Sequence, residues 1–315
     1  MIPTLSIIVP VFNEEKALAF TSKELLSELS IMVKNKLIHR NSFLLFVDDG
    51  SADASWQILK QLHETHANLF AIKLSQNFGH NNALYAGLIR LADRVDISIS
   101  IDCDLQQSPK LIPQFIQKYK LGADIVYGVR NNRSTDSFSK KITAILFYRF
   151  MKLMRVNIIN NHADFRLLSS KVMKKLSQYK EPDLFLRGIL ANIGFNKDFV
   201  YFDVTDREHG DSKYTYFKMI KFAFLAITSF TSFPLRIVTL VGFITLILSI
   251  IMSMYVFTVS IIYRASIPGW ASIILPIYFI GGVQIFCIGI IGEYLARVYE
   301  TVKARPTYII EEDLF

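Results

Sequence analysis

The chain has 315 residues, of which 51% are hydrophobic, and its mean hydropathy is +0.32. This composition allows a large core but is too apolar for a wholly soluble protein, and the excess is concentrated near the C-terminus. The formal charge of +8 would suit nucleic acid, anionic lipid or an anionic substrate, but no zinc finger, RNA-recognition signature or basic repeat supports nucleic acid, so lipid and phosphate remain.

Short apolar runs alternate with segments of helical periodicity through the first part of the chain. This alternation predicts a doubly wound, mostly parallel α/β sheet, whose ligands bind at the carboxyl ends of the strands. Strands are expected at Leu5–Val11, Phe43–Val47, Phe70–Leu74, Ile97–Ile101 and Ile125–Tyr127, with helices at Glu15–Lys34, Ser51–Lys60 and Asn81–Ala92. Polar residues follow these strands at Asn13, Asp48, Asn77 and Asp102. Because these residues would share one edge of the sheet, they indicate a binding site there.

Two carboxylates, Asp102 and Asp104, end the fourth strand one residue apart. In a continuing strand they would point to opposite faces, so they converge only if the backbone turns there. Pro109 then opens a helix. Converging carboxylates at a strand end would hold Mg²⁺ or Mn²⁺ together with substrate phosphates. Since Asp-x-Asp also occurs in turns and caps, the motif alone leaves that alternative open.

Two uncharged runs, Ile237–Tyr263 and Ala271–Gly292, are each long enough to cross a hydrocarbon core about 30 Å thick. They are predicted to form a transmembrane hairpin, preceded by an amphipathic helix that would lie on the lipid bilayer. Lys and Arg gather on one side of the hairpin, so the positive-inside rule predicts that the catalytic region and the C-terminal tail are cytoplasmic. The expected location is the inner (cytoplasmic) membrane, as a multi-pass protein. The predicted divisions are a catalytic domain over 1–213, the amphipathic helix over 214–234, the hairpin over 235–292 and a C-terminal tail over 293–315.

Two further features of the chain leave alternatives open. The basic segment Ser137–Arg155 could lie along an anionic membrane surface or pack as a core helix with solvated lysines. Gly282, Gly289 and Ala296 recur every seven residues. This spacing permits close helix packing within the hairpin or in a homo-oligomer, and it is equally compatible with ordinary glycine usage.

Motifs spread over nearly the whole chain resemble the polyprenyl-phosphate glycosyltransferases of glycosyltransferase family 2, which include bactoprenol glucosyltransferases and dolichol-phosphate mannose synthases. The matching stretches are Val9-Pro-Val-Phe-Asn-Glu14, Asp48-Asp-Gly-Ser51, Ser75-Gln-Asn-Phe-Gly-His80, Asp102-Cys-Asp-Leu-Gln106, Gly128-Val-Arg-Asn-Asn-Arg133, Asp164-Phe-Arg-Leu167, Arg207-Glu-His-Gly-Asp-Ser-Lys-Tyr214, Gly292-Glu-Tyr-Leu295 and Arg305-Pro-Thr-Tyr308. Cys103 stands where alanine is more usual between the two aspartates, and so small a neutral change should leave metal binding intact.

This resemblance implies a GT-A (Rossmann-like) nucleotide-sugar fold. It also implies an inverting enzyme that moves one sugar from a nucleotide diphosphate to the phosphate of a long isoprenoid lipid. The likeness favours UDP-glucose as donor and undecaprenyl phosphate as acceptor, giving a lipid-linked sugar for cell-envelope glycan modification. GDP-mannose, UDP-galactose, UDP-N-acetylglucosamine and an aminoarabinose donor remain open, since sugar choice rests on a few hydroxyl contacts that no motif reports.

Carried over position by position, the resemblance assigns four groups of residues. The nucleotide-sugar pocket would comprise Pro10, Asn13, Glu14, Asp48, Asp49, Asp102 and Gln106. The metal ion, Mg²⁺ or Mn²⁺, would be held by Asp102, Asp104 and Gln106. The acceptor phosphate would be bound by Arg130, Arg133 and Lys213. The catalytic residues would be Asp104, Asp164, Arg166 and Arg207, the two arginines also binding phosphate.

Asp164 is the family's candidate base, but a lipid phosphate is already anionic at neutral pH and needs little deprotonation. We therefore expect Asp164 to orient Arg166 or the sugar, while a helix N-cap before Phe165 stays open as an alternative. Similarly, one of Asp48 and Asp49 is expected to cap the helix over 51–60, which leaves the other for uracil or ribose.

Two other functions compete with this one. A processive polysaccharide synthase is disfavoured because neither Trp56 nor Trp270 lies in a Gln-x-x-Arg-Trp motif. A membrane-tethered nucleotide-sugar scaffold without turnover is disfavoured because a mere binder would not need both the carboxylate pair and the arginines. His80 and His209 have no second His or Cys at ligand spacing and are interpreted as polar loop residues.

Overall fold

The computed structural model describes residues 2–131, 162–179, 185–203 and 270–315, together with positions 235, 238, 240–245, 247, 248, 251 and 254. Its elements are β1 (Leu5–Val11), α1 (Leu18–Lys34), β2 (Phe43–Asp48), α2 (Ser55–Thr65), β3 (Leu69–Leu74), α3 (His80–Leu91), β4 (Ile97–Ser100), η1 (Pro109–Leu111), α4 (Ile112–Lys120), β5 (Ile125–Arg130), β6 (His162–Ser169), α6 (Ser170–Leu176), α7 (Leu186–Asn192), β7 (Lys197–Phe202), α10 (Trp270–Lys303) and β8 (Ile310–Leu314).

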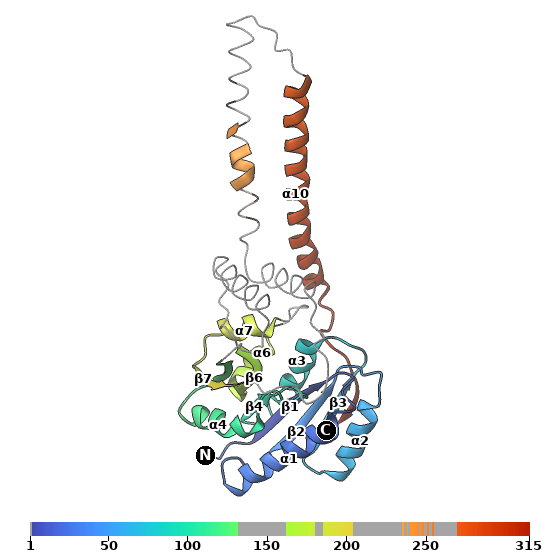
Figure 1. The fold of residues 1–315 in the computed structure, drawn as a ribbon, viewed down its shortest axis with the longest axis vertical. Coiled ribbons are helices and arrows are strands. Elements are labelled where there is room, and N and C mark those ends of the chain that lie inside the picture. Colours follow the sequence, from blue (N-terminus) through green and yellow to red (C-terminus); the bar gives the residue numbers. More distant parts are fainter. Residues whose placement is uncertain are drawn as a thin grey trace, which may run out of the picture.

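The described strands form one sheet in the order β7-β5-β6-β4-β1-β2-β3-β8 (Figure 1). β1 pairs in parallel with β2 and β4, β2 with β3, and β5 with β7. β6 runs antiparallel between β4 and β5, and β8 runs antiparallel to β3. The predicted mostly parallel α/β architecture is therefore confirmed, and the carboxyl ends of β1, β2, β3 and β4 meet at one edge.

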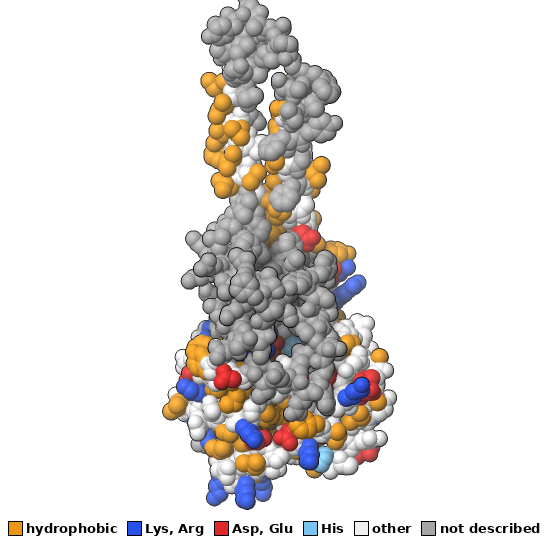
Figure 2. Space-filling view, in the orientation of Figure 1, with side chains coloured by type: hydrophobic (Ala, Val, Ile, Leu, Met, Phe, Trp, Pro, Cys, Tyr) orange, Lys and Arg blue, Asp and Glu red, His pale blue; other side chains and the backbone are white. Residues whose placement is uncertain are grey.

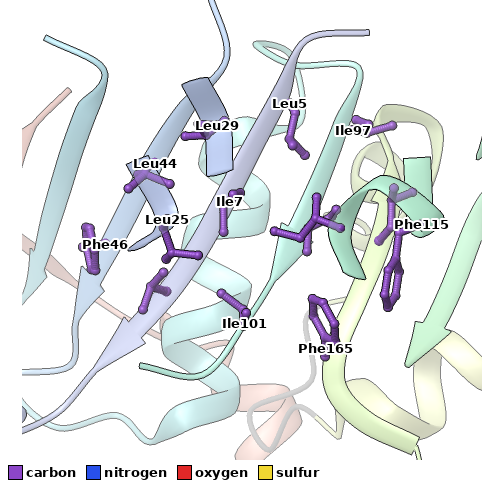
Figure 3. Close-up of a cluster of buried hydrophobic side chains, with 14 of the residues drawn as sticks. Leu5, Ile7, Leu25, Leu29, Leu44, Phe46, Ile97, Ile101, Phe115 and Phe165 are labelled. Carbon is purple, nitrogen blue, oxygen red and sulfur yellow. The ribbon is translucent and has the colours of Figure 1, made fainter. Parts of the chain in front are cut away.

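A core of apolar side chains covers each face of the sheet. Leu25 and Leu29 lie one helical turn apart on α1 and pack against the strand residues Ile7 and Phe46 (Figure 3). The other face carries residues of α3, α6 and α7. β1 is buried almost throughout because both of its faces are covered, which explains its nearly continuous apolar run.

β6 was not predicted from the sequence. It inserts between β4 and β5, and its register places Arg166 opposite both Ser100 of β4 and Tyr127 of β5. Asp164 lies inside this strand, so the alternative in which it caps a helix is wrong. Its pairing with β4 and β5 joins parts of the chain that are distant in the sequence, and sequence periodicity does not report such pairings.

The last residues of the chain return to the sheet as β8 (Figure 1). Glu312 accepts a hydrogen bond from Trp56 Nε1 at 3.0 Å and pairs with Lys60 at 2.6 Å. The ring of Phe315 packs against Phe43 and Phe70, with centroids 5.4 and 4.8 Å away. β8 thus covers the edge of β3, which would otherwise present unpaired backbone groups.

Removing residues 310–315 is expected to lower the free energy of unfolding by about 2–4 kcal/mol, because the edge of β3 and the Phe43 and Phe70 rings become exposed. Urea denaturation measures the change. Leu121→Ala, at a side chain that is 82% exposed, serves as control and should change stability by less than about 0.5 kcal/mol. Equal stability of the truncated and natural proteins would contradict a structural role for β8.

The described part of the chain contains no helix that is both long enough and apolar enough to cross a membrane. The prediction of a transmembrane hairpin over 235–292 is therefore wrong. The predicted multi-pass location in the inner membrane depended on this hairpin and is wrong for the same reason. The prediction rested on the absence of charged residues, and this alone does not establish a helix that spans a membrane. α10 contains Pro276 and carries Glu293, Glu300 and Lys303 towards its end.

The excess of apolar residues is nevertheless visible in the structure. Hydrophobic side chains lie along α10, which projects away from the sheet (Figures 1 and 2). Ile285, Ile288 and Leu295 are among those that are largely exposed. The amphipathic helix predicted over 214–234 and the basic segment Ser137–Arg155 lie outside the described residues.

Candidate active site

The loops that follow β1 and β2 are joined by hydrogen bonds. Asn13 adopts a left-handed backbone conformation with φ 54°. Its backbone N–H donates to the Ser51 hydroxyl at 2.9 Å, and its side-chain Oδ1 accepts from Ala52 N–H at 2.9 Å. The Glu14 N–H donates to the Ser55 hydroxyl at 3.0 Å. These contacts bring Asn13 and Glu14, predicted for the nucleotide-sugar pocket, next to the end of β2; Pro10, from the same predicted group, lies in β1 opposite Val47.

Asp48 and Asp49, at the end of β2, are both buried but have different partners. Asp48 accepts hydrogen bonds from the hydroxyl and the backbone N–H of Ser51. Asp49 accepts from the backbone N–H groups of Phe78 at 2.8 Å and Gly79 at 2.9 Å. The prediction that one of them caps the helix is wrong, because α2 begins only at Ser55 and has no side-chain cap. Asp49 instead fixes the loop that follows β3.

Gly50 allows these two loops to approach closely. Its φ is +67°, a conformation that favours glycine, and a Cβ atom here would lie 2.4 Å from the carbonyl carbon of Gln76. No side chain fits at that distance. The Asp-Asp-Gly-Ser motif is therefore explained in part by packing of the loop after β2 against the loop after β3.

Burial raises the pKa of Asp49 to about 6, although the two backbone N–H groups oppose this shift. Because the pKa is raised, Asp49 gains a proton as the pH falls through 6, and a protonated oxygen accepts a backbone hydrogen bond poorly. We expect KM for the nucleotide sugar to rise several-fold between pH 7 and pH 5 as the loop loosens. Initial rates measure this effect, and Asp49→Asn should have a raised KM that changes little over this range. Parallel pH profiles for the two proteins would contradict the assignment.

The backbone turns immediately after β4, as convergence of the two carboxylates requires. The Leu105 N–H donates to the Asp102 carbonyl at 3.2 Å, and Leu105 has a φ of 47°. Between the carboxylates, Cys103 points into the core, and its carbonyl accepts from the Thr21 hydroxyl at 2.6 Å. Burial raises the pKa of the Cys103 thiol to about 12. The thiol therefore stays protonated and anchors the turn under α1.

The Asp102 and Asp104 side chains are only partly buried and are oriented by the residues that follow them. Asp102 Oδ2 accepts from Gln107 Nε2 at 2.9 Å, and Asp104 Oδ1 accepts from the Gln106 backbone N–H at 3.2 Å. Among the described residues there is no group of three or more His, Cys, Asp or Glu that could hold a metal ion. Two carboxylates with hard oxygen donors nevertheless fit Mg²⁺ or Mn²⁺, which commonly bind through one or two carboxylates and substrate phosphates.

Asp164 lies among two arginine side chains and one histidine side chain. Arg166, two residues along β6, donates to Asp164 Oδ1. Arg187 of α7 donates from Nε to Oδ1 at 3.3 Å and from Nη2 to Oδ2 at 2.9 Å. His80 Nε2, at the start of α3, lies 3.5 Å from Asp164 Oδ2 and 3.8 Å from Asp102 Oδ1. His80 thus links Asp164 to the Asp-x-Asp turn.

The charges in this cluster control its protonation. Burial would raise the pKa of Asp164, but Arg187, Arg166 and His80 hold it well below the usual range. Burial lowers the pKa of His80, yet the hydrogen bond and charge of Asp164, with the charge of Asp102, raise it above its ordinary value. Asp164 therefore stays ionised at neutral pH, which makes it a poor proton acceptor.

Of the cationic residues predicted from the sequence, the structure describes Arg130 and Arg166. Arg166 is 1% exposed, and its Nη1 has no hydrogen-bond partner among the described residues. Arg130 ends β5, opposite Phe202 of β7. Arg133, Arg207, Lys213 and His209 lie outside the described residues. Arg187 was not predicted from the sequence because no motif includes it. His80, interpreted from the sequence as a polar loop residue, lies close to both Asp102 and Asp164.

Comparison with known proteins agrees with this arrangement. Residues 6–177 match the profile described as Glycosyl transferase family 2. An uncharacterized glycosyltransferase of Bacillus subtilis is 43% identical over 99% of this chain and 93% of its own length. A prophage bactoprenol glucosyl transferase homolog of Escherichia coli is 36% identical, and the bactoprenol glucosyl transferase of Shigella phage SfX is 35% identical, each match covering 98% of both chains. With the motifs, the sheet and these relatives in agreement over nearly its whole length, the chain belongs to glycosyltransferase family 2.

Proposed function

We propose that this glycosyltransferase transfers one glucosyl residue from UDP-glucose to undecaprenyl phosphate, with inversion at the anomeric carbon. The observation that carries the proposal is the likeness to relatives named bactoprenol glucosyl transferase, at 35–36% identity over 98% of this chain. Because this likeness extends beyond the nucleotide-binding half, it favours the same class of lipid-phosphate acceptor. The product would be a lipid-linked sugar for modification of cell-envelope glycans.

The donor is proposed to bind at the carboxyl ends of β1, β2 and β4. Pro10, Asn13, Glu14, Asp48 and Asp49 would form the nucleoside side of this site. Asp102, Asp104 and Gln106 would hold Mg²⁺ or Mn²⁺ with the diphosphate. When bound, the ion would neutralise charge on the leaving diphosphate.

In the proposed reaction, an oxygen of the lipid phosphate attacks the anomeric carbon while the bond from that carbon to the diphosphate breaks. The electron pair of the broken bond leaves with UDP, and no proton need be removed because the phosphate is already ionised. The main obstacle is bringing two anionic substrates together. Arg166, with Arg130, Arg133, Arg207 and Lys213, would offset their repulsion, and arginine does so with fixed geometry.

A donor panel tests the proposal. Purified protein in detergent, with Mg²⁺ and undecaprenyl phosphate, is offered radiolabelled UDP-glucose, UDP-galactose, UDP-N-acetylglucosamine, GDP-mannose and an aminoarabinose donor. We expect one glycolipid from UDP-glucose, with inverted anomeric configuration by NMR. A product from another donor alone would replace glucose in the proposal. Binding of nucleotide without any product would contradict the proposed reaction and favour a scaffold that does not turn over.

A further inference from the structure

Arg187 contacts both oxygens of Asp164, and Asp164 in turn contacts Arg166. We propose that Arg187 is a positioning residue that acts through Asp164 to hold the Arg166 guanidinium in place for a phosphate group of the substrate. This inference takes the identity of the substrate from the proposed function, whereas the contacts among Arg187, Asp164 and Arg166 are independent of that function.

The fold explains how Arg187 can position Asp164. Asp164 and Arg166 are two residues apart in a strand, so their side chains lie on the same face of β6. Arg187 comes from α7, whose residues Leu186, Ile189 and Leu190 are buried in the core. A helix anchored in this way presents Arg187 to Asp164 from a fixed position, and two hydrogen bonds prevent the carboxylate from rotating.

The state of Arg166 indicates that the cluster serves a ligand. Its side chain is only 1% exposed, and one nitrogen, Nη2, is paired with Asp164. The other terminal nitrogen, Nη1, is buried without a hydrogen-bond partner among the described residues. A buried charged donor without a partner is costly. A phosphate oxygen would satisfy it, either from the donor diphosphate or from the acceptor phosphate.

Arg187 is expected to matter through its partner rather than through its own charge. Without it, Asp164 keeps His80 and Arg166 as neighbours but can rotate, and Arg166 is no longer fixed. A lysine at position 187 would keep the charge and one hydrogen bond, but it would lose the two-pronged contact. Removing Asp164 should make Arg187 irrelevant, because the connection between the two arginines is then already broken.

The test is a double-mutant cycle with Arg187→Gln, Asp164→Asn and the double variant, together with Arg187→Lys. We expect Arg187→Gln to lower kcat about 10- to 100-fold and Arg187→Lys to recover only part of this loss, because lysine restores one hydrogen bond without the two-pronged contact. The double variant should lie within about threefold of Asp164→Asn alone. Arg90→Gln is the matched control, because Arg90 is equally exposed, at 33%, and pairs with Asp313 away from this cluster. Additive losses would overturn the proposal.

Two further measurements separate the sources of the phosphate and protect the test from failure of the proposed function. A rise in KM for undecaprenyl phosphate in Arg187→Gln identifies the acceptor phosphate, and a rise in KM for UDP-glucose identifies the donor. Independently, thermal shift with inorganic pyrophosphate should show about tenfold weaker binding for Arg187→Gln than for Arg90→Gln. If no donor reacts but this difference is found, the proposed function falls and the role of Arg187 stands. If glycolipid forms, but pyrophosphate binding is unchanged in Arg187→Gln and the losses of kcat in the double-mutant cycle are additive, the proposed role of Arg187 is wrong and the proposed function stands.

Discussion

Replacing Asp104 by asparagine is expected to lower the rate of sugar transfer by about a thousandfold. The substitution keeps the size of the side chain and its place beside the Gln106 N–H, but it removes the negative charge that would hold the metal ion. Loss of several kcal/mol of charge stabilisation on the leaving diphosphate corresponds to three powers of ten in rate. Initial rates of radiolabelled transfer with saturating Mg²⁺ measure the effect.

The same experiment includes a chelator and a control. Chelation of the natural protein should reproduce the loss, and added Mg²⁺ or Mn²⁺ should restore activity. Asp93→Asn is a suitable control because Asp93 is an exposed carboxylate that pairs with Lys174, away from the Asp-x-Asp turn. Full activity of Asp104→Asn, or of the natural protein with chelator, would show that the assignment of the metal site is wrong.

Replacing Asp164 by asparagine is expected to lower the free energy of unfolding by about 3 kcal/mol and kcat by about a hundredfold. The stability loss arises because Arg166 keeps its buried charge while its ionised partner disappears. The activity loss arises because the arginine is no longer oriented. Urea denaturation and initial rates measure the two effects, and Asp198→Asn, which breaks an exposed pair with Lys118, should cost less than about 1 kcal/mol.

The loss of stability in Asp164→Asn is expected to depend on pH in a definite direction. The pKa of Asp164 is held well below its usual range by Arg187, Arg166 and His80, against the effect of burial. A carboxyl with a lowered pKa contributes stability above its unfolded pKa and loses that contribution only as the pH falls through the native value. The difference between Asp164→Asn and the natural protein should therefore not decrease between pH 8 and pH 5, and it should grow as the pH falls through the pKa of His80, which Asp164 raises. A difference that disappears near pH 5 would show that Asp164 titrates in the ordinary range.

The position of Asp164 also bears on its part in the reaction. A general base must accept a proton near the working pH, and a carboxylate paired with two arginines is poorly suited to that task. This agrees with the expectation, drawn from the anionic acceptor, that Asp164 orients other groups. Its catalytic role stays a proposal until the variants above are measured.

Several elements could be predicted from the sequence because their signals are local. β1 has the predicted bounds, and β2, β3 and β4 lie within one residue of theirs, since each is a short apolar run that ends in turn residues. The turn at Cys103 followed from the need for two carboxylates in one strand to converge. The family likewise followed from motifs that stand in order along the chain.

Other features depended on contacts between distant parts of the chain. Strand pairing alone decided that β6 lies between β4 and β5 and that β8 covers β3. The uncharged runs near the C-terminus predicted spanning helices that the described residues do not contain, because the absence of charge in a run does not by itself establish a helix that spans a membrane.

The chemical groups available to this protein could be identified from its residues alone: the carboxylate pair after β4, the arginines and the polar ends of the parallel strands. Which of these groups act together depends on how the chain folds. It directed Asp49 to the loop after β3, and it brought His80, Arg166 and Arg187 to a single carboxylate. The physical reason is that hydrogen bonds and ion pairs depend on distances in space, and residues from α3, β6 and α7 become neighbours only when the sheet assembles.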